Sequence, residues 1–204
     1  MKIGIVDYGC GNVASIKNIL RYIGYDANLT RNVIDIVDFD SIILPGVGHF
    51  QNGMEHINAS GLRDALDLRA SMNMPILGIC LGMQLMTGGS DEAPDNEGLG
   101  WFGCQTKKIP NSIDGKRLLV PHMGWNYVDG DKEFFDRGDR FYFVHSYYVD
   151  AVGSSEELGR TEYNGYMLSS AIKKGALTGV QFHPEKSHQY GMQFFKNYLR
   201  SIGE

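Results

Sequence analysis

Short apolar runs and amphipathic segments alternate up to Gly88, and this alternation constrains the fold more than any other feature of the sequence. Apolar runs of this kind are typical of strands that are buried in a parallel sheet. Strands that alternate with helices predict a doubly wound α/β sheet. The predicted strands are Lys2–Asp7, Tyr25–Thr30, Ser41–Leu44 and Pro75–Cys80, and the helical segments are 13–23, His49–Ile57, Leu62–Ser71 and Gly82–Met86.

The sequence changes character after Gly88. The stretch Gly88–Gly100 is glycine-rich and acidic, which indicates a loop, and shorter strands follow that suit an antiparallel extension of the sheet. A last helix places Met192, Phe195, Leu199 and Ile202 on one face. We find no repeat or linker, so the prediction is one domain over residues 1–204. The short strands are predicted at Phe102–Ile109, Arg117–Val120, Arg140–Val149, Met167–Lys173 and Ala176–Phe182.

Composition excludes several classes of protein. The formal net charge is −5 with no offsetting basic cluster, which argues against a nucleic-acid partner. The N-terminal apolar segment is too short and too soon interrupted for a signal peptide, and no apolar run approaches the ~18 residues of a membrane span. Cys10, Cys80 and Cys104 lie far apart, so neither a disulfide framework nor a metal site is indicated. We expect a cytoplasmic protein without a cofactor.

The pentapeptide Gly78-Ile79-Cys80-Leu81-Gly82 stands between a predicted buried strand and a predicted helix. This is the cysteine form of a nucleophile elbow, in which small flanking residues allow a sharp turn that exposes the nucleophile. A helix N-terminus also favours the thiolate, which is the attacking species. A lone cysteine after an apolar run is equally compatible with a core residue.

A second motif, Gln181-Phe182-His183-Pro184-Glu185, follows the last predicted strand. A cysteine nucleophile needs a base for its proton, and the base needs a third group that fixes its tautomer. His183 and Glu185 supply both roles within three residues. Both this motif and the elbow close a strand at its carboxyl end, where the sites of open α/β sheets gather.

A third motif, Leu44-Pro45-Gly46-Val47-Gly48, ends another predicted strand. Acyl transfer passes through an oxyanion that needs preorganised N–H donors, and a glycine-rich strand end can present them, as can the Leu81 N–H. Most such stretches are only turns, so this motif alone is a weak signal.

The three motifs together resemble the class I, triad-type glutamine amidotransferases. Within that class the chain is similar to the glutaminase subunits of imidazole glycerol phosphate synthase. The elbow and the His-Pro-Glu unit are common to the class, whereas Pro121–Asn126 and Phe141–Tyr147 are specific to the subfamily. Matching stretches run through the whole chain: Asp7–Asn12, Leu44–Gly48, Gly78–Leu85, Pro121–Asn126, Phe141–Tyr147 and Gly179–Ser187.

The resemblance implies a flavodoxin-like three-layer sandwich and hydrolysis of glutamine to glutamate and ammonia. Cys80 would be the nucleophile, His183 the base and acid, and Glu185 its orienting group. The oxyanion would be held at Val47, whose peptide must reorient, and at Leu81. The implied binding residues for glutamine are Gly48, Gln84, Glu92, Ser146 and Tyr147.

The resemblance also implies a heterodimer with a (β/α)₈-barrel cyclase, which receives ammonia through an internal channel. The residues that match the family's interface are Asn12, Trp125, Tyr142 and Lys186. Trp125 and Tyr142 are also compatible with an aromatic core. Cys10 and Cys104 have no base near them in sequence, so we interpret both as structural.

Several alternatives stay open. The chain could serve anthranilate or pyridoxal phosphate synthesis, although Pro121–Asn126 and Phe141–Tyr147 weigh against that. A peptidase or chaperone of the DJ-1/PfpI type would lack the His-Pro-Glu unit, and a non-catalytic binding subunit would not need the triad. A paralogue that supplies ammonia for surface-sugar amidination remains, because Thr87–Gly89 and Trp101–Cys104 depart from the subfamily pattern.

Overall fold

An eight-stranded sheet forms the centre of the computed structural model, which describes residues 1–113 and 115–203. The strand order is β2-β1-β3-β4-β14-β13-β12-β9. The first five strands are parallel and the last three are antiparallel to their neighbours. The strands are β1 (Ile3–Val6), β2 (Ala27–Thr30), β3 (Ser41–Gly46), β4 (Ile76–Cys80), β9 (Asp129–Gly130), β12 (Glu157–Tyr163), β13 (Tyr166–Lys174) and β14 (Leu177–Val180). The order of the parallel part is that of flavodoxin-like sheets, as predicted.

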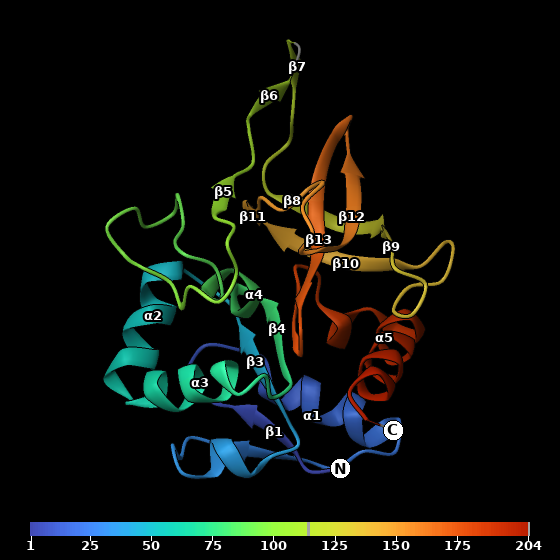
Figure 1. Cartoon of the computed structure of the whole chain (residues 1–204). Helices are drawn as coiled ribbons and strands as arrows, with labels where there is room; N and C mark the ends of the chain where they lie inside the picture. The colour runs from blue at the N-terminus through green and yellow to red at the C-terminus, as the bar shows by residue number, and fades with distance from the viewer. Residues whose placement is uncertain (114, 204) are drawn as a thin grey trace.

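Helices cover both faces of the sheet and make three layers (Figure 1). Successive strand residues point to opposite faces, so Ile43 joins the core under α1 and α5 while Ile42 and Leu44 join the core under α2 and α3. The helices are α1 (Val13–Tyr22), α2 (Phe50–Ala59), α3 (Leu62–Ser71), α4 (Leu81–Leu85) and α5 (His188–Ser201), with 3₁₀ turns η1 (Asp35–Asp38) and η2 (Pro184–Lys186). The predicted three-layer fold is confirmed.

Three small two-stranded sheets stand outside the central one. They are β8 (His122–Tyr127) with β10 (Arg140–His145), β5 (Thr106–Lys108) with β11 (Tyr147–Val149), and β6 (Ser112–Ile113) with β7 (Lys116–Arg117). In Figure 1 they lie above the helical layers, and the β6–β7 hairpin projects farthest.

Two predictions for this region are wrong. The stretch Arg140–Val149 is two strands, because the Ser146 carbonyl accepts from the Ile109 N–H at 2.9 Å and the chain changes its partner from β8 to β5. Phe102–Ile109 and Arg117–Val120 contribute only short strands, and none of these three stretches extends the central sheet. Its antiparallel part is built from β13, β12 and β9, since β13 already occupies the free edge of β14.

Strand β12 has no counterpart among the predicted elements. Its register against β13 shifts on both sides of Gly159. This irregularity interrupts the alternation of apolar and polar residues by which a strand is predicted from sequence. A glycine also fits there because a Cβ atom would come within 3.2 Å of the Phe135 and Val128 side chains.

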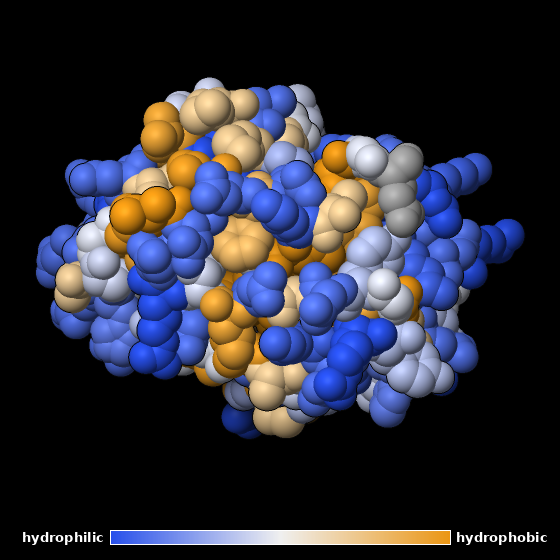
Figure 2. Space-filling view, turned by 90° about the horizontal axis from the view of Figure 1, so that it is seen from below, coloured by the Kyte–Doolittle hydropathy of each residue, from blue (hydrophilic) through white to orange (hydrophobic). Residues whose placement is uncertain are grey.

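The end of the molecule that carries the N label in Figure 1 is shown from below in Figure 2. Hydrophilic side chains form most of its rim, and apolar ones show between them near the centre. The described residues contain no helix with the length and apolarity that crossing a bilayer requires. Strands β3 and β4 run away from this end, so their carboxyl ends meet on the side of the small sheets (Figure 1).

Candidate functional site

Three predicted motifs meet at the carboxyl ends of three neighbouring strands. Strand β4 lies between β3 and β14, with Gly46 paired to Cys80 and Val180 paired to Ile79. The Pro-Gly motif therefore begins on one side of Cys80 and the His-Pro-Glu motif on the other. The parallel pairing brings together segments that are more than a hundred residues apart in the chain.

The turn at Cys80 is strained in the manner of a nucleophile elbow. Cys80 has φ +54° and ψ −110°, a conformation that L residues adopt only where their surroundings impose it. A Cβ atom at Gly82 would collide with the Leu44 carbonyl oxygen, and one at Gly78 would meet the Met83 backbone nitrogen at 2.8 Å. The two glycines therefore allow the close packing that holds Cys80 in this turn.

His183 and Glu185 form a buried pair behind Cys80. His183 Nδ1 lies 2.8 Å from Glu185 Oε1, and each side chain is only 2% exposed. The other carboxylate oxygen, Glu185 Oε2, is buried without a hydrogen-bond partner in the described part of the chain. The carboxylate charge is thus directed at the imidazole, which fixes the hydrogen on Nδ1 and leaves Nε2 for the cysteine.

Electrostatics favour the protonated form of His183. Burial alone would lower its pKa, but hydrogen bonds with Cys80 and Glu185 and the charges of both groups outweigh burial and raise it to about 9. The His183 imidazole is therefore held as a cation in direct hydrogen-bond contact with Cys80.

The backbone of His183 is anchored to the small β8–β10 sheet. Its N–H donates to the Tyr142 carbonyl at 2.9 Å, and its carbonyl accepts from Ser187 Oγ at 2.7 Å. Ser187 Oγ in turn accepts from the Tyr142 N–H at 3.0 Å. The β8–β10 sheet therefore helps to set the position of His183.

A cavity of about 580 Å³ opens beside Cys80. It is lined by Val47, Gly48, Cys80, Leu81, Gln84, Glu92, Pro121, Val144, His145, Ser146, Tyr147 and Lys186. Nine of these residues were predicted for the site or the interface, and they come from the ends of β3, β4 and β10 and from the elements that follow β3, β4, β10 and β14, including α4, β11 and η2. Every residue predicted to bind glutamine lies on this cavity.

The side chains of Gln84 and Glu92 are held by neighbouring groups. Gln84 Nε2 donates to the Tyr147 carbonyl at 2.9 Å and to Gln181 Oε1 at 3.0 Å, so both of its hydrogens are used. Glu92 Oε2 accepts from the Phe50 N–H at 2.8 Å, at the N-terminus of α2. Gln84 can donate to a carboxylate only after it releases one acceptor, whereas the Glu92 side chain lines the cavity as a hydrogen-bond acceptor.

Known proteins resemble this chain over nearly its whole length. The family model described as glutamine amidotransferase class-I matches residues 4–202. This chain belongs to the class I glutamine amidotransferase family. Its members are glutamine amidotransferases, which agrees with the predicted enzyme class.

Curated relatives cover nearly the whole chain. The imidazole glycerol phosphate synthase subunit HisH 2 of Methanococcus maripaludis is 43% identical over 97% of this chain and 98% of that protein. The imidazole glycerol phosphate synthase subunit HisH 2 of Pseudomonas aeruginosa is 38% identical, and the match covers 97% of this chain and 98% of that protein. The subunit HisH of Sulfurimonas denitrificans is 39% identical, with 97% of each covered.

Solved structures share the amidotransferase fold at lower identity. A structure described as a glutamine amidotransferase superposes with a TM-score of 0.77 at 17% identity and covers 99% of both chains. A structure described as PurLQS from Thermotoga maritima gives a TM-score of 0.70 at 18% identity, with 98% of each chain covered.

Three of the four predicted interface residues gather on one surface. Trp125 on β8 is 44% exposed and lies edge-on to Tyr142 on β10, with ring centroids 6.4 Å apart. Lys186 Nζ lies 5.9 Å from the centre of the Tyr142 ring. Trp125 is therefore a surface residue rather than a core aromatic. Asn12 precedes α1, and its side chain makes no capping hydrogen bond there.

Cys10 has a histidine nearby that the sequence did not indicate. His56 Nδ1 lies 3.3 Å from Cys10 Sγ and 3.1 Å from the Tyr8 carbonyl oxygen. Because a carbonyl can only accept, Nδ1 carries a hydrogen and cannot take the thiol proton. Burial raises the pKa of Cys10, and burial followed by the charge of Glu156 raises that of Cys104 to about 11. Both cysteines thus keep their protons at neutral pH.

Sequence reasoning gave no role to Gln181 or His145. Gln181 Nε2 lies 3.7 Å from Cys80 Sγ, and Gln181 Oε1 accepts a hydrogen bond from Gln84 Nε2. His145 lines the cavity. Both lie inside motifs already singled out, and that position was the only available signal.

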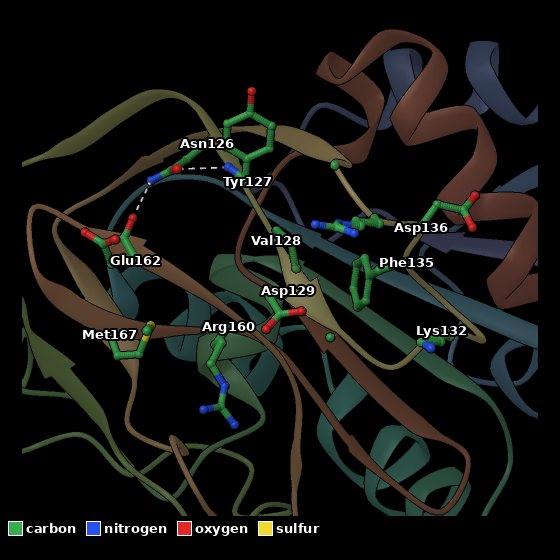
Figure 3. A pocket seen from close by; sticks show the side chains of 13 residues that line it. Asn126, Tyr127, Val128, Asp129, Lys132, Phe135, Asp136, Arg160, Glu162 and Met167 are labelled. Carbon is green, nitrogen blue, oxygen red and sulfur yellow. Dashed lines mark hydrogen bonds between the residues drawn. The ribbon is translucent and has the colours of Figure 1, made fainter.

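A larger cavity of about 690 Å³ lies between β8, β9 and β12 and contains none of the predicted site residues (Figure 3). Acidic and basic side chains are balanced on its walls.

Proposed function

We propose that this chain is the glutaminase subunit of an imidazole glycerol phosphate synthase. The observation that carries the proposal is the strained Cys80 beside the buried His183–Glu185 pair, in a chain that matches HisH proteins over nearly its whole length. The substrate is glutamine, and the products are glutamate and ammonia.

In the proposed reaction Cys80 Sγ attacks the side-chain amide carbon of glutamine. The thiol proton resides on His183 Nε2, and it passes to the departing nitrogen as the C–N bond breaks, which releases ammonia and leaves a γ-glutamyl thioester. His183 then takes a proton from water, the hydroxide attacks the thioester, and the proton returns to the cysteine sulfur. Glu185 orients the ring and stabilises its positive charge throughout.

The oxyanion of each tetrahedral intermediate is held by backbone N–H groups at Val47 and Leu81. Val47 is 42% exposed and follows the end of β3, and Gly48 has φ +107°, so this segment has the freedom that a reorienting peptide needs. Glu92 binds the α-ammonium group of glutamine, Gln84 its α-carboxylate, and Gly48, Ser146 and Tyr147 contribute backbone groups.

The partner is a (β/α)₈-barrel cyclase that docks over Asn12, Trp125, Tyr142 and Lys186 and takes up the ammonia. Support comes from the exposed aromatic and basic side chains gathered beside the cavity. The partner uses ammonia to form imidazole glycerol phosphate and aminoimidazole carboxamide ribonucleotide. One domain over residues 1–204 and a cytoplasmic location complete the proposal.

A second candidate is a paralogue whose ammonia serves surface-sugar amidination. Two of the relatives carry the number 2 after the subunit name, which favours keeping this candidate.

Genetics separates the two candidates. Deletion of the gene should make the organism require histidine, and a Cys80→Ala copy should fail to restore growth at low ammonia. A deletion strain that grows without histidine and has altered surface glycan would assign the chain to the second candidate and leave the chemistry at Cys80 as proposed.

A further inference from the structure

One buried histidine lines the cavity and a second, on strand β8, contacts it, and the reaction proposed above uses neither. His122 and His145 are 2% and 7% exposed and face each other across the β8–β10 pair. His122 Nδ1 lies 2.9 Å from His145 Nε2. The His122 ring stacks on Phe143 at 4.6 Å and lies 4.2 Å from the Tyr163 ring. Such a buried contact needs one donor and one acceptor, so the tautomers of the two rings are linked.

The Tyr147 carbonyl decides which nitrogen carries the hydrogen. It lies 2.8 Å from His145 Nδ1 and can only accept, so Nδ1 is the donor. Burial lowers the pKa of His145 to about 3 and that of His122 to about 4, so both rings are neutral at physiological pH. A neutral imidazole has one N–H, so His145 Nε2 is an acceptor and receives the hydrogen bond from His122 Nδ1. The only N–H of His122 is then at Nδ1, which makes His122 Nε2 an acceptor as well.

Asn126 supplies the donor for that last nitrogen. Its Oδ1 accepts from the Tyr127 N–H at 2.8 Å, which fixes the orientation of the amide (Figure 3). Its Nδ2 then donates to the Glu162 carbonyl at 3.0 Å and to His122 Nε2 at 3.3 Å. The hydrogen bonds therefore run in one direction only, from Asn126 through His122 and His145 to the Tyr147 carbonyl.

This chain of hydrogen bonds ends on the wall of the cavity. The Tyr147 carbonyl also accepts from Gln84 Nε2 at 2.9 Å, so both of its lone pairs are used. Gln84 and Tyr147 line the cavity beside Cys80. Gln84 must give up one of its two acceptors to bind a carboxylate, and when Gln181 Oε1 is given up only the Tyr147 carbonyl still holds the amide in place. A change in the histidine pair would turn the Tyr147 peptide and remove that remaining bond, while the groups behind Cys80 would keep their own contacts.

We propose that His122 and His145 are positioning residues that hold the Tyr147 carbonyl, and with it Gln84, in the orientation that binds glutamine. The proposal rests on the proposed function, since it assigns a task in substrate binding to residues outside the triad. Their effect should fall on KM for glutamine rather than on kcat, because neither ring contacts the reacting bond.

Matched substitutions at His145 test this directly. Asn and Leu have nearly the same shape, but only Asn offers an N–H near the position of Nδ1. In the complex with the partner, His145→Leu should raise KM for glutamine about tenfold, the effect of one lost hydrogen bond, with kcat within about threefold. His145→Asn should recover KM to within about threefold. The same Asn and Leu pair at His56, which lies outside the cavity, should leave both constants unchanged.

Equal KM values for wild type, His145→Leu and His145→Asn would overturn the proposal, as would a loss confined to kcat. ¹⁵N NMR of the histidine rings in the wild-type protein gives a readout that needs neither variant nor turnover. Both rings should be neutral with the hydrogen on Nδ1 at pH 7, and an Nε2–H tautomer or a charged ring at either position would also overturn it. A wild-type complex that does not hydrolyse glutamine would instead refute the proposed function and leave the NMR result intact.

Discussion

The parallel half of the sheet and the small sheets above it contribute to the candidate site in different ways. Strands β3, β4 and β14 end at the site and carry the groups that we propose to react, each placed by the turn that follows its own strand. The small sheets carry groups that hold others in place: the Tyr142 carbonyl binds the His183 N–H, and the Tyr147 carbonyl binds Gln84. Changes in the first region should therefore abolish turnover, and changes in the second should alter binding or coupling.

The largest expected effect is at Cys80. Cys80→Ala should lower glutamine hydrolysis about 10⁴-fold or more, since no other group in the cavity can form the thioester. A diazo-ketone analogue of glutamine should label this cysteine alone, as measured by peptide mass spectrometry. Label on Cys10 or Cys104, or turnover retained in Cys80→Ala, would show that the strand ends do not hold the nucleophile.

The first half of the chain was predictable because its signals are local. Leu62–Ser71 is the helix α3 that the sequence predicts, and the predicted strand Pro75–Cys80 differs from β4 by one residue. The approach of Cys80 to His183 and Glu185 could be predicted for the same reason, because the residues that shape each turn are its sequence neighbours.

The second half was less predictable because its contacts are made between distant strands. Nothing local in Arg140–Val149 shows that the chain changes partner at Ser146. The His122–His145 contact depends on the pairing of β8 with β10. The sequence does not predict β12, because the register shifts around Gly159 interrupt its apolar alternation. The contacts of His122, His145 and Gln181 were therefore not predicted from the sequence, although most of the residues that line the cavity were.

A second test concerns the charge behind His183. Glu185→Gln removes the carboxylate, which stabilises the imidazolium, so the pKa of His183 should fall below its raised value of about 9. We expect kcat to drop about 10³-fold, and the loss of activity at high pH should begin at a lower pH than in wild type. The pH profile of kcat for the two complexes measures the shift. An unchanged basic limb would mean that another group determines it.

A third test removes the partner. With the Val47 peptide turned away, one oxyanion donor is lost, which costs about 3–4 kcal/mol or 10²–10³ in rate. The isolated chain should hydrolyse glutamine slower than the complex by that factor, with the stimulation strongest when the barrel carries its own ligand. Steady-state ammonia release with and without partner is the measurement, and full activity of the lone chain would contradict the gating.

The smallest effect is expected at Lys186, where the two regions meet. Its ammonium group lies over the Tyr142 ring and on the cavity, but its side chain is exposed, so Lys186→Ala should change the free energy of unfolding by no more than about 0.5 kcal/mol. If the lysine controls the passage of ammonia from the cavity to the barrel, the variant should hydrolyse glutamine at a normal rate. A smaller fraction of the released ammonia should then appear in the product of the partner. The ratio of glutamate to partner product, with exposed Lys196→Ala on α5 as control, measures this coupling. A ratio of one in both variants would leave Lys186 as an ordinary surface lysine and would restrict the covering sheets to substrate binding.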